Sequence, residues 1–207
     1  MNVLGPQRFI MPPIDLDKLK VDIVLLSHTH YDHYDEKTAR KIGNKALWLV
    51  PLGVKDMLKE IGITNCVEMD RWESYTYTTP SKSTLEVIFT PTKHWTSRTL
   101  FDRNTTLWGS FVVLSDHARY FFAGDTAYCS VFQLIGQKYG PFDMASIPIG
   151  AYSPRWFLKD VHCNPEEAVR IHQDLRAKRS TAIHWGTFPM SHESFIEPAL
   201  ELGTDHV

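Results

Sequence analysis

A dense cluster of titratable side chains lies near the beginning of this sequence. The stretch SHTHYDHYD, residues 27–35, contains three histidines and an aspartate in close succession: His28, His30, Asp32 and His33. It continues from DIVLLS (22–27), an apolar run typical of a buried β-strand. Imidazole and carboxylate groups are costly to bury, and apolar residues would fill a core better. The cluster therefore indicates a functional site at the end of a strand.

Strand-like and helix-like segments alternate along the chain. Apolar runs that are rich in β-branched or aromatic residues predict strands at 22–27, 47–51, 85–91, 109–115, 119–124, 144–150 and 180–185. Helix start and stop signals predict helices at 35–42, 52–62 and 164–178. SDHAR (115–119), between two strand-like runs, is typical of a hairpin turn, so mixed rather than purely parallel sheets are expected. This alternation predicts an α/β fold.

Size and charge exclude several classes of protein. With 207 residues, 43% of them hydrophobic, the chain can form one globular domain, which is expected to span residues 1–207. Its formal net charge is −2 and its 22 Lys and Arg residues are scattered, which argues against a nucleic-acid-binding surface. No apolar run approaches the roughly 18 residues of a membrane span, and no signal peptide is evident. Any membrane contact is therefore expected to be peripheral.

Further polar side chains follow other predicted strands. Lys93 and His94 follow the apolar run at 85–91, Asp125 follows the run at 119–124, and His184 follows the run at 180–183. Loops at the carboxyl ends of strands in an α/β sheet meet at one edge, so a single site is expected. Imidazoles and carboxylates are the usual ligands of zinc and similar divalent ions, which take about four donors each. Five histidines and two aspartates would suit two ions if one aspartate bridges them.

Several longer phrases resemble a known family. SHTHYDH, GDT and AIHWGT are similar to the motifs of the metallo-β-lactamase superfamily. VPLGVKDML, FFAGDTAYC, GPFDMASIPIGAYSPRWF and HCNPEEAVRIH resemble one branch of it, the zinc phospholipases D that hydrolyse N-acyl-phosphatidylethanolamine. The resemblance implies an αββα sandwich of two mixed sheets. Only 27 residues precede His28, so the domain is expected to lack its N-terminal part and the first sheet to be incomplete.

The resemblance also assigns roles to individual residues. One zinc ion is expected to bind His28, His30 and His94, the other to bind Asp32, His33 and His184, and Asp125 is expected to bridge both. Tyr31 and His162 are marked as contacts of the phospholipid headgroup; from the residues alone, His162 would be an unremarkable loop histidine. The candidate catalytic residues are Asp32, Asp125 and His162.

The implied activity is a zinc-dependent phosphodiester hydrolysis of the phospholipase D type. N-acyl-phosphatidylethanolamine would yield N-acylethanolamine and phosphatidic acid, with a metal-bridging hydroxide as the expected nucleophile. The resemblance further implies a homodimer, a bile-acid ligand and an intracellular location, at the cytosolic face of Golgi or endosome-like membranes or in the cytosol. YSPRWFLKD (152–160) combines aromatic and basic residues and predicts a membrane-facing or substrate-covering loop. Ser97 stands where the family commonly has a lysine.

Two alternative functions are compatible with the same ligands. Another hydrolase of this fold, such as a sugar-phosphate lactonase or a nuclease, would differ only in its pocket, and the scattered basic residues disfavour the nuclease. A catalytically silent, zinc-binding relative would keep the ligands without turnover. If strands before residue 22 are missing, the 22–27 strand should expose an edge, and the chain should be marginally stable and dependent on zinc.

Overall fold

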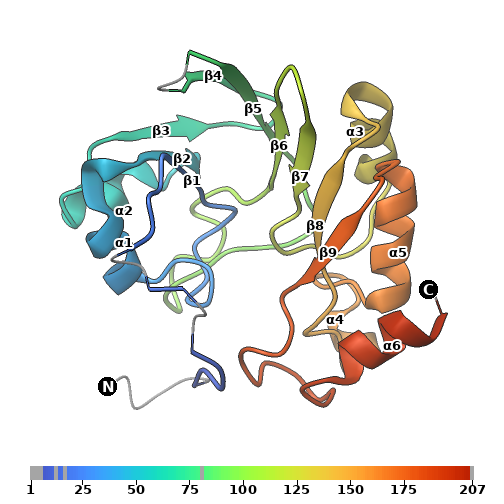
Figure 1. Ribbon diagram of the computed structural model, residues 1–207. Coiled ribbons are helices and arrows are strands. Elements are labelled where there is room, and N and C mark those ends of the chain that lie inside the picture. The colour runs from blue at the N-terminus through green and yellow to red at the C-terminus, as the bar shows by residue number, and fades with distance from the viewer. Residues whose placement is uncertain (1–6, 12–13, 16–17, 80–81, 206–207) are drawn as a thin grey trace. The chain divides into compact units, whose positions relative to one another are not determined.

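The computed structural model describes residues 7–11, 14–15, 18–79 and 82–205 (Figure 1). The chain divides into two compact units, which are described separately. The first unit comprises residues 12–91 and 95–116, and the second comprises 1–11, 92–94 and 117–207. The expectation of a single domain over residues 1–207 is not tested by this division and stays a prediction.

The first unit contains a parallel sheet of three strands in the order β1 (Ile23–Leu25), β2 (Leu47–Pro51) and β3 (Cys66–Met69). Helix α1 (Glu36–Ile42) and the short 3-10 helix η1 (Gly43–Lys45) connect β1 to β2, and α2 (Lys55–Glu60) connects β2 to β3 (Figure 1). Such helical crossovers are what parallel strands require. Within the described residues, β1 forms one edge of this sheet, and its side chains are half-buried.

An apolar core joins these helices to the sheet. Its buried members are Leu26, Tyr34, Ala39, Trp48, Val50, Val54, Leu58, Ile63 and Cys66. Asp35, the last residue of SHTHYDHYD, caps α1 by accepting a hydrogen bond from the Thr38 backbone N–H at 2.9 Å. The histidine-rich segment is therefore anchored between a strand and a capped helix.

Three antiparallel strands complete the first unit. They are β4 (Ser74–Thr78), β5 (Thr84–Thr90) and β6 (Ser110–Leu114), paired in that order. Phe89 and Phe111 are fully buried, and their ring centroids lie 5.1 Å apart across the β5–β6 pair. These strands matter for the site because the segment between β5 and β6 carries the loop that braces the histidine-rich segment.

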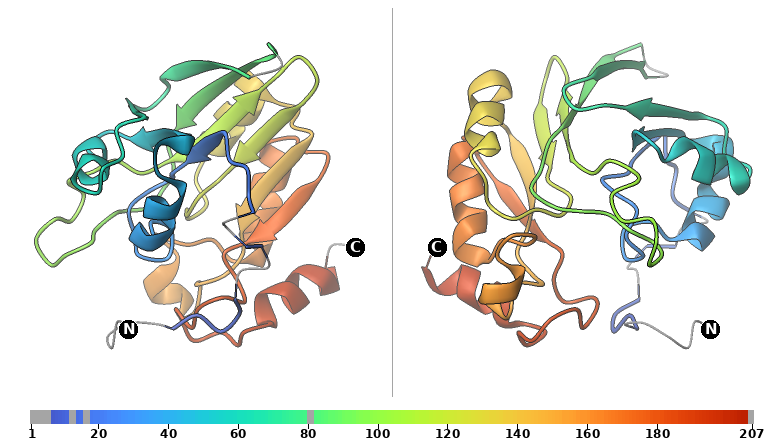
Figure 2. Two further views of the ribbon diagram at one scale, coloured as in Figure 1. Left: turned by 60° about the vertical axis from the view of Figure 1, so that its left-hand side comes forward. Right: turned by 180° about the vertical axis from the view of Figure 1, so that it is seen from behind.

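The second unit is built on three parallel strands in the order β7 (Arg119–Phe122), β8 (Met144–Pro148) and β9 (Ser180–Ile183). Its helices are α3 (Val131–Tyr139), α4 (Arg155–Leu158), α5 (Pro165–Asp174) and α6 (Glu197–Asp205). Figures 1 and 2 show α3 above the C-terminal end of α5, with both helices next to the strands. A side chain on Gly136 of α3 would collide with the Asp174 carbonyl at the end of α5, so glycine permits this close packing.

The sequence-based secondary structure is largely confirmed. All of the predicted strands and helices are present within a few residues, and the strand directions are mixed as expected, although β1–β3 are parallel throughout their described residues. The strands β3 and β4 and the helices α3, α4 and α6 were not predicted. Among the described residues, no helix is long and apolar enough to cross a lipid bilayer.

Candidate functional site

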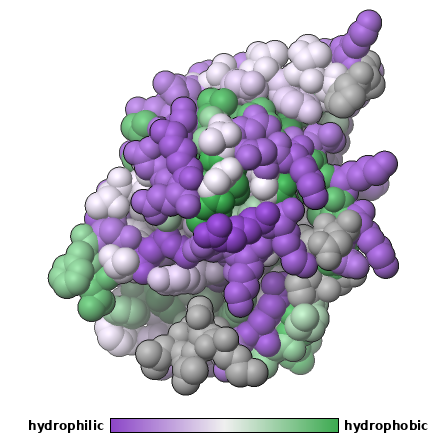
Figure 3. All heavy atoms as spheres, turned by 90° about the vertical axis from the view of Figure 1, so that its left-hand side faces the viewer, coloured by the Kyte–Doolittle hydropathy of each residue, from purple (hydrophilic) through white to green (hydrophobic). Residues whose placement is uncertain are grey.

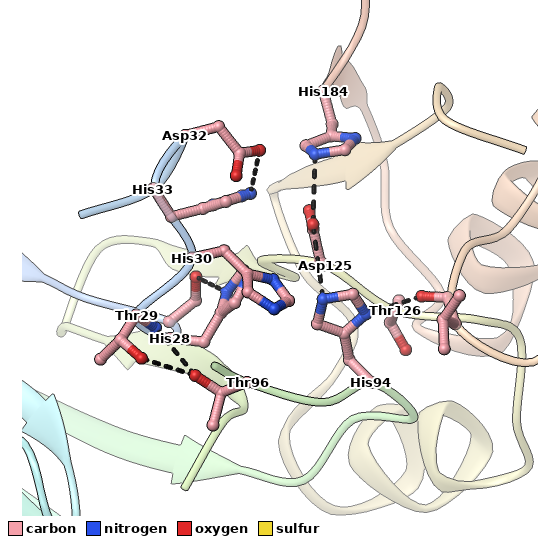
Figure 4. A network of polar contacts seen from close by, with 12 residues as sticks. His28, Thr29, His30, Asp32, His33, His94, Thr96, Asp125, Thr126 and His184 are labelled. Atoms are coloured by element: carbon pink, nitrogen blue, oxygen red, sulfur yellow. Dashed lines mark hydrogen bonds and ion pairs between the residues drawn. The ribbon is translucent and has the colours of Figure 1, made fainter. Parts of the chain in front are cut away.

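Four predicted metal ligands gather after β1 in the first unit. This first-unit cluster consists of His28, His30, Asp32 and His33 (Figure 4). The Nε2 atom of His28 lies 2.9 Å from Nδ1 of His30, and Nε2 of His33 lies 3.1 Å from an Asp32 carboxylate oxygen. The ring centroids of His28 and His33 are 4.1 Å apart. The cluster thus presents three imidazoles and one carboxylate at short range.

A turn of the backbone brings these side chains together. The N–H groups of His33 and Tyr34 both donate to the His30 carbonyl, at 3.1 and 2.8 Å. The preceding residue, Thr29, is tied by its hydroxyl to the Thr96 hydroxyl at 2.6 Å. Because the chain turns at His30, residues on either side of it point their ligand atoms toward one region.

Arg98 braces this segment from outside. Its Nη1 atom donates to the carbonyls of Thr29, at 2.8 Å, and Tyr34, at 3.0 Å, which lie at the two ends of the turn. The guanidinium also lies over the Tyr31 ring, 4.2 Å from its centroid, and the Tyr31 hydroxyl donates to the Arg98 carbonyl at 2.7 Å. Arg98 therefore fixes the distance between the two ends of the turn. Three of the four ligands of this cluster lie between those ends.

Asp102 in turn holds the loop that carries Arg98. Its carboxylate accepts hydrogen bonds from the Thr99 N–H at 2.7 Å, the Ser97 hydroxyl at 2.8 Å and the Arg98 N–H at 3.0 Å. The Thr99 N–H and then the Ser97 hydroxyl lower the pKa of Asp102 to about 2, so the carboxylate is ionised near neutral pH. Ser97 is therefore a structural hydrogen-bond donor here.

The second unit contributes the other three predicted ligands. This second-unit cluster consists of His94, Asp125 and His184 (Figure 4). One carboxylate oxygen of Asp125 lies 3.1 Å from Nε2 of His184 and 3.7 Å from Nε2 of His94. Asp125 follows β7 and His184 follows β9, and both strands pair in parallel with β8. Their carboxyl ends therefore lie at the same edge, as the sequence predicts.

The supporting contacts suit histidines that bind metal. Nδ1 of His94 lies 2.8 Å from the Val161 carbonyl, which can only accept, so this nitrogen carries the proton and Nε2 keeps its lone pair. His184 adopts a left-handed backbone conformation with φ of 62°, which is unusual for a residue with a side chain. A side chain on Gly150 would collide with the His184 carbonyl, so glycine is required beside this ligand.

His162 lies next to the second-unit cluster. It is buried, its ring stacks on His184 at a centroid distance of 5.3 Å, and it meets the His94 ring edge-on at 5.0 Å. The next residue, Cys163, donates its N–H to the Thr126 carbonyl at 2.8 Å, which ties this loop to the segment after Asp125. Only the family resemblance singled out His162, because its position depends on a contact between distant loops.

Three aromatic residues singled out by the sequence lie at the surface, whereas Cys163 does not. Tyr31 is 64% exposed, and its proposed contact with a headgroup stays a prediction. Trp156 and Phe157 on α4 are 78% and 67% exposed, as a membrane-facing or substrate-covering segment requires, and that role also stays a prediction. Cys163 is fully buried and its thiol donates to the Pro148 carbonyl, so it is a structural filler; burial raises the pKa of this thiol.

The chemistry of both clusters fits a divalent metal ion. The first-unit cluster offers three imidazoles and a carboxylate, and the second-unit cluster offers two imidazoles and a carboxylate. Nitrogen and oxygen donors of this kind suit zinc, which binds them at roughly 2.0–2.2 Å. His28, His94 and Asp125 are buried, and a carboxylate removed from water is stabilised by nearby positive charge.

Comparison with known proteins decides the family. A family profile described as "Beta-lactamase superfamily domain" matches residues 1–185. The chain belongs to this superfamily. The archaeal metallo hydrolase Igni18 from Ignicoccus hospitalis has the same fold, with a TM-score of 0.69 and 21% identity over 91% of this chain and 74% of that one. The metallo-β-lactamase fold expected from the motifs is therefore confirmed.

Two superfamily relatives confirm the expected branch. The chain is 42% identical over 204 residues to "N-acyl-phosphatidylethanolamine-hydrolyzing phospholipase D 1" of Caenorhabditis elegans, covering 94% of this chain and 57% of that protein. It is 37% identical over 208 residues to a yeast protein named "N-acyl-phosphatidylethanolamine-hydrolyzing phospholipase D, mitochondrial", covering 97% of this chain and 44% of that protein. The chain thus spans about half the length of these relatives. Superfamily membership and the two clusters together indicate a metal-binding protein of this superfamily.

The brace by Arg98 gives a testable prediction for metal affinity. Arg98→Ala should weaken metal binding by about tenfold, because outer residues that orient ligands typically contribute 10–100-fold. Arg98→Lys should restore part of the loss, since lysine keeps a donor but lacks the planar group that stacks on Tyr31. The measurement is a zinc titration against a competing chelator, with circular dichroism to verify folding.

Arg40→Ala is the matched control for this experiment. Arg40 lies on α1 of the same unit, is exposed, and contacts Glu36 rather than the histidine-rich segment. Its removal should leave zinc affinity unchanged. Equal affinities of the Arg98→Ala and Arg40→Ala proteins would show that the brace does not position the ligands.

Proposed function

We propose that this chain is the metal-binding part of a zinc-dependent phospholipase D that hydrolyses N-acyl-phosphatidylethanolamine. The observation that carries the proposal is a full set of ligand-type residues in a chain 42% identical to a phospholipase D named for this substrate. The products would be N-acylethanolamine and phosphatidic acid. The homodimer, the bile-acid ligand and the association with internal membranes stay predictions.

In this proposal, the two clusters combine to hold two zinc ions. His28, His30 and His94 would hold one ion, Asp32, His33 and His184 would hold the other, and Asp125 would be shared. The sharing gives each ion four protein donors, which is the number that zinc takes most often. The short distances from one Asp125 oxygen to both His94 and His184 support this role for Asp125.

The chain's own residues would orient the substrate and handle protons. Bound zinc supplies an activated water near neutral pH and positive charge for the phosphoryl oxygens. Asp125 would help to hold the zinc ions. The Val161 carbonyl keeps the His94 proton on Nδ1, so Nε2 of His94 stays available to bind zinc. His162, whose ring packs on two of the ligand imidazoles, is placed to hold the phosphate or to protonate the departing alkoxide oxygen.

The direct test is hydrolysis of the lipid by the purified protein. N-acyl-phosphatidylethanolamine dispersed in detergent should release N-acylethanolamine, a chelator should stop the reaction, and added zinc should restore it. Asp125→Asn should abolish activity, because the amide keeps the shape of the side chain but cannot supply the anionic bridge. Product is measured by mass spectrometry, and metal content is measured on the same samples. Full metal loading without turnover, or turnover by Asp125→Asn with two bound ions, would contradict the proposal.

His162→Ala separates catalysis from metal binding. Turnover should fall by about 10²–10⁴-fold, the usual contribution of a general acid or base, while the metal content stays unchanged. His162→Asn should recover part of the activity if hydrogen bonding to the phosphate is the main contribution. His172→Ala is the matched control. His172 lies on α5, and its ring hydrogen-bonds the Ser180 hydroxyl rather than a predicted metal ligand. Loss of zinc from His162→Ala would show instead that His162 is a ligand or supports one.

A further inference from the structure

The loop between β5 and β6 presents two apolar side chains to solvent. Leu100 is 93% exposed and Phe101 is 95% exposed, the highest values among the large hydrophobic residues that the structure describes. These two residues are called the apolar tip. We propose that the apolar tip docks the first unit onto an anionic phospholipid surface by inserting both side chains among the lipids.

The tip is exposed although its loop is firmly held. Asp102 accepts three hydrogen bonds from residues 97–99, and the Thr105 hydroxyl donates to the Asp102 carbonyl at 2.8 Å. The Asn104 N–H donates to the Thr96 carbonyl at 2.8 Å, which closes the base of the loop. A loop fixed in this way keeps its apolar side chains outward and loses little conformational freedom when it binds.

The shape of the tip favours a lipid surface over a protein partner. Figure 2 shows the loop extending beyond the helices of the same unit, and Figure 3, turned further about the same axis, shows hydrophobic side chains projecting at that edge of a mostly hydrophilic face. A stable protein interface buries about 800 Å² per partner, far more than two side chains on a narrow loop provide. A bilayer accepts such isolated apolar side chains, as peripheral proteins show.

Cationic and aromatic groups next to the tip match the edge of an anionic membrane. Arg103 is exposed two residues after Phe101, and its guanidinium lies 5.0 Å from the centroid of the Trp95 ring. The charge of Asp102 is engaged by the hydrogen bonds within the loop. Arginine and tryptophan are favoured at the membrane interface, where the first attracts lipid phosphates and the second has an amphipathic ring.

Docking through this loop would also reach the ligands of the same unit. Arg98 lies between the base of the loop and the tip and donates to the carbonyls at both ends of the histidine-rich turn, so one residue connects the loop to the first-unit cluster. The choice of a phospholipid surface as the occupant rests on the proposed function, because the substrate of that function resides in a bilayer.

Vesicle binding without hydrolysis tests the docking. The full chain is sedimented with vesicles of phosphatidylcholine and phosphatidylserine that contain no N-acylated lipid. Leu100→Ser/Phe101→Ser should bind about 100-fold more weakly than wild type, because two large apolar side chains lose their burial. Leu100→Ser should show part of that loss, whereas Leu134→Ser, at an exposed leucine of α3, should bind like wild type.

The outcomes for docking and for catalysis are distinguishable. Wild-type affinity of the double variant, with a native circular dichroism spectrum, would overturn the docking proposal, even if the protein hydrolyses detergent-dispersed lipid. Vesicle binding that depends on the apolar tip, in a protein that hydrolyses no lipid, would overturn the proposed function and leave the docking intact. Equal loss of vesicle binding in Leu134→Ser and Leu100→Ser would also overturn the docking proposal, because it would show that an exposed leucine outside the apolar tip contributes as much to binding as one within it.

Discussion

The contact of one buried carboxylate oxygen with two imidazoles organises the second unit. Asp125 is 2% exposed, and the same oxygen faces both His94 and His184. Removing a carboxylate from water costs several kcal/mol unless positive charge compensates it. The parallel strands β7, β8 and β9 hold Asp125 and His184 at one edge, and Gly150 leaves space for the His184 backbone. The fold thus creates a buried carboxylate that a bound cation would stabilise.

In the first unit, four predicted ligands lie on a segment of irregular backbone, so hydrogen bonds from neighbouring residues must hold that segment in place. The Asp35 cap of α1 fixes one end of this segment, and the Thr29–Thr96 hydroxyl contact fixes the other. Arg98 then joins both ends of the turn, and Asp102 holds Arg98 in place. The positions of the ligands therefore depend on residues that are not themselves proposed ligands, and two of these, Arg98 and Asp102, lie in the loop that also carries the apolar tip.

Much of the fold and most of the candidate site follow from the sequence. Strands β1, β2 and β5–β9 have clear apolar runs, and ligands placed directly after a strand can be recognised from their chemistry. In contrast, β4 reads SYTYT, whose polar residues carry no burial signal, and α3 contains Gly136, which lowers helix propensity but is required by its contact with α5.

The roles of Arg98 and His162 depend on contacts between residues distant in the sequence. Arg98 bonds carbonyls more than 60 positions away, and carbonyl groups leave no trace in a sequence pattern. His162 packs against His94 and His184 because of a loop contact through Cys163, so only its family resemblance marked it. A pattern of residues can identify ligands, whereas the groups that position them become visible only in three dimensions.

We propose that the two clusters share their metal ions, and the metal content of single and double variants tests this proposal. Metal per chain is measured by mass spectrometry of purified, folded proteins. Two zinc ions per chain are expected in the wild type and one in each of His33→Ala, His184→Ala and the double variant His33→Ala/His184→Ala, because both residues would bind the same ion. His28→Ala/His184→Ala, which affects both ions, should retain less than one. Loss of both ions from His33→Ala/His184→Ala, with one retained in each single variant, would show instead that His33 and His184 bind different ions.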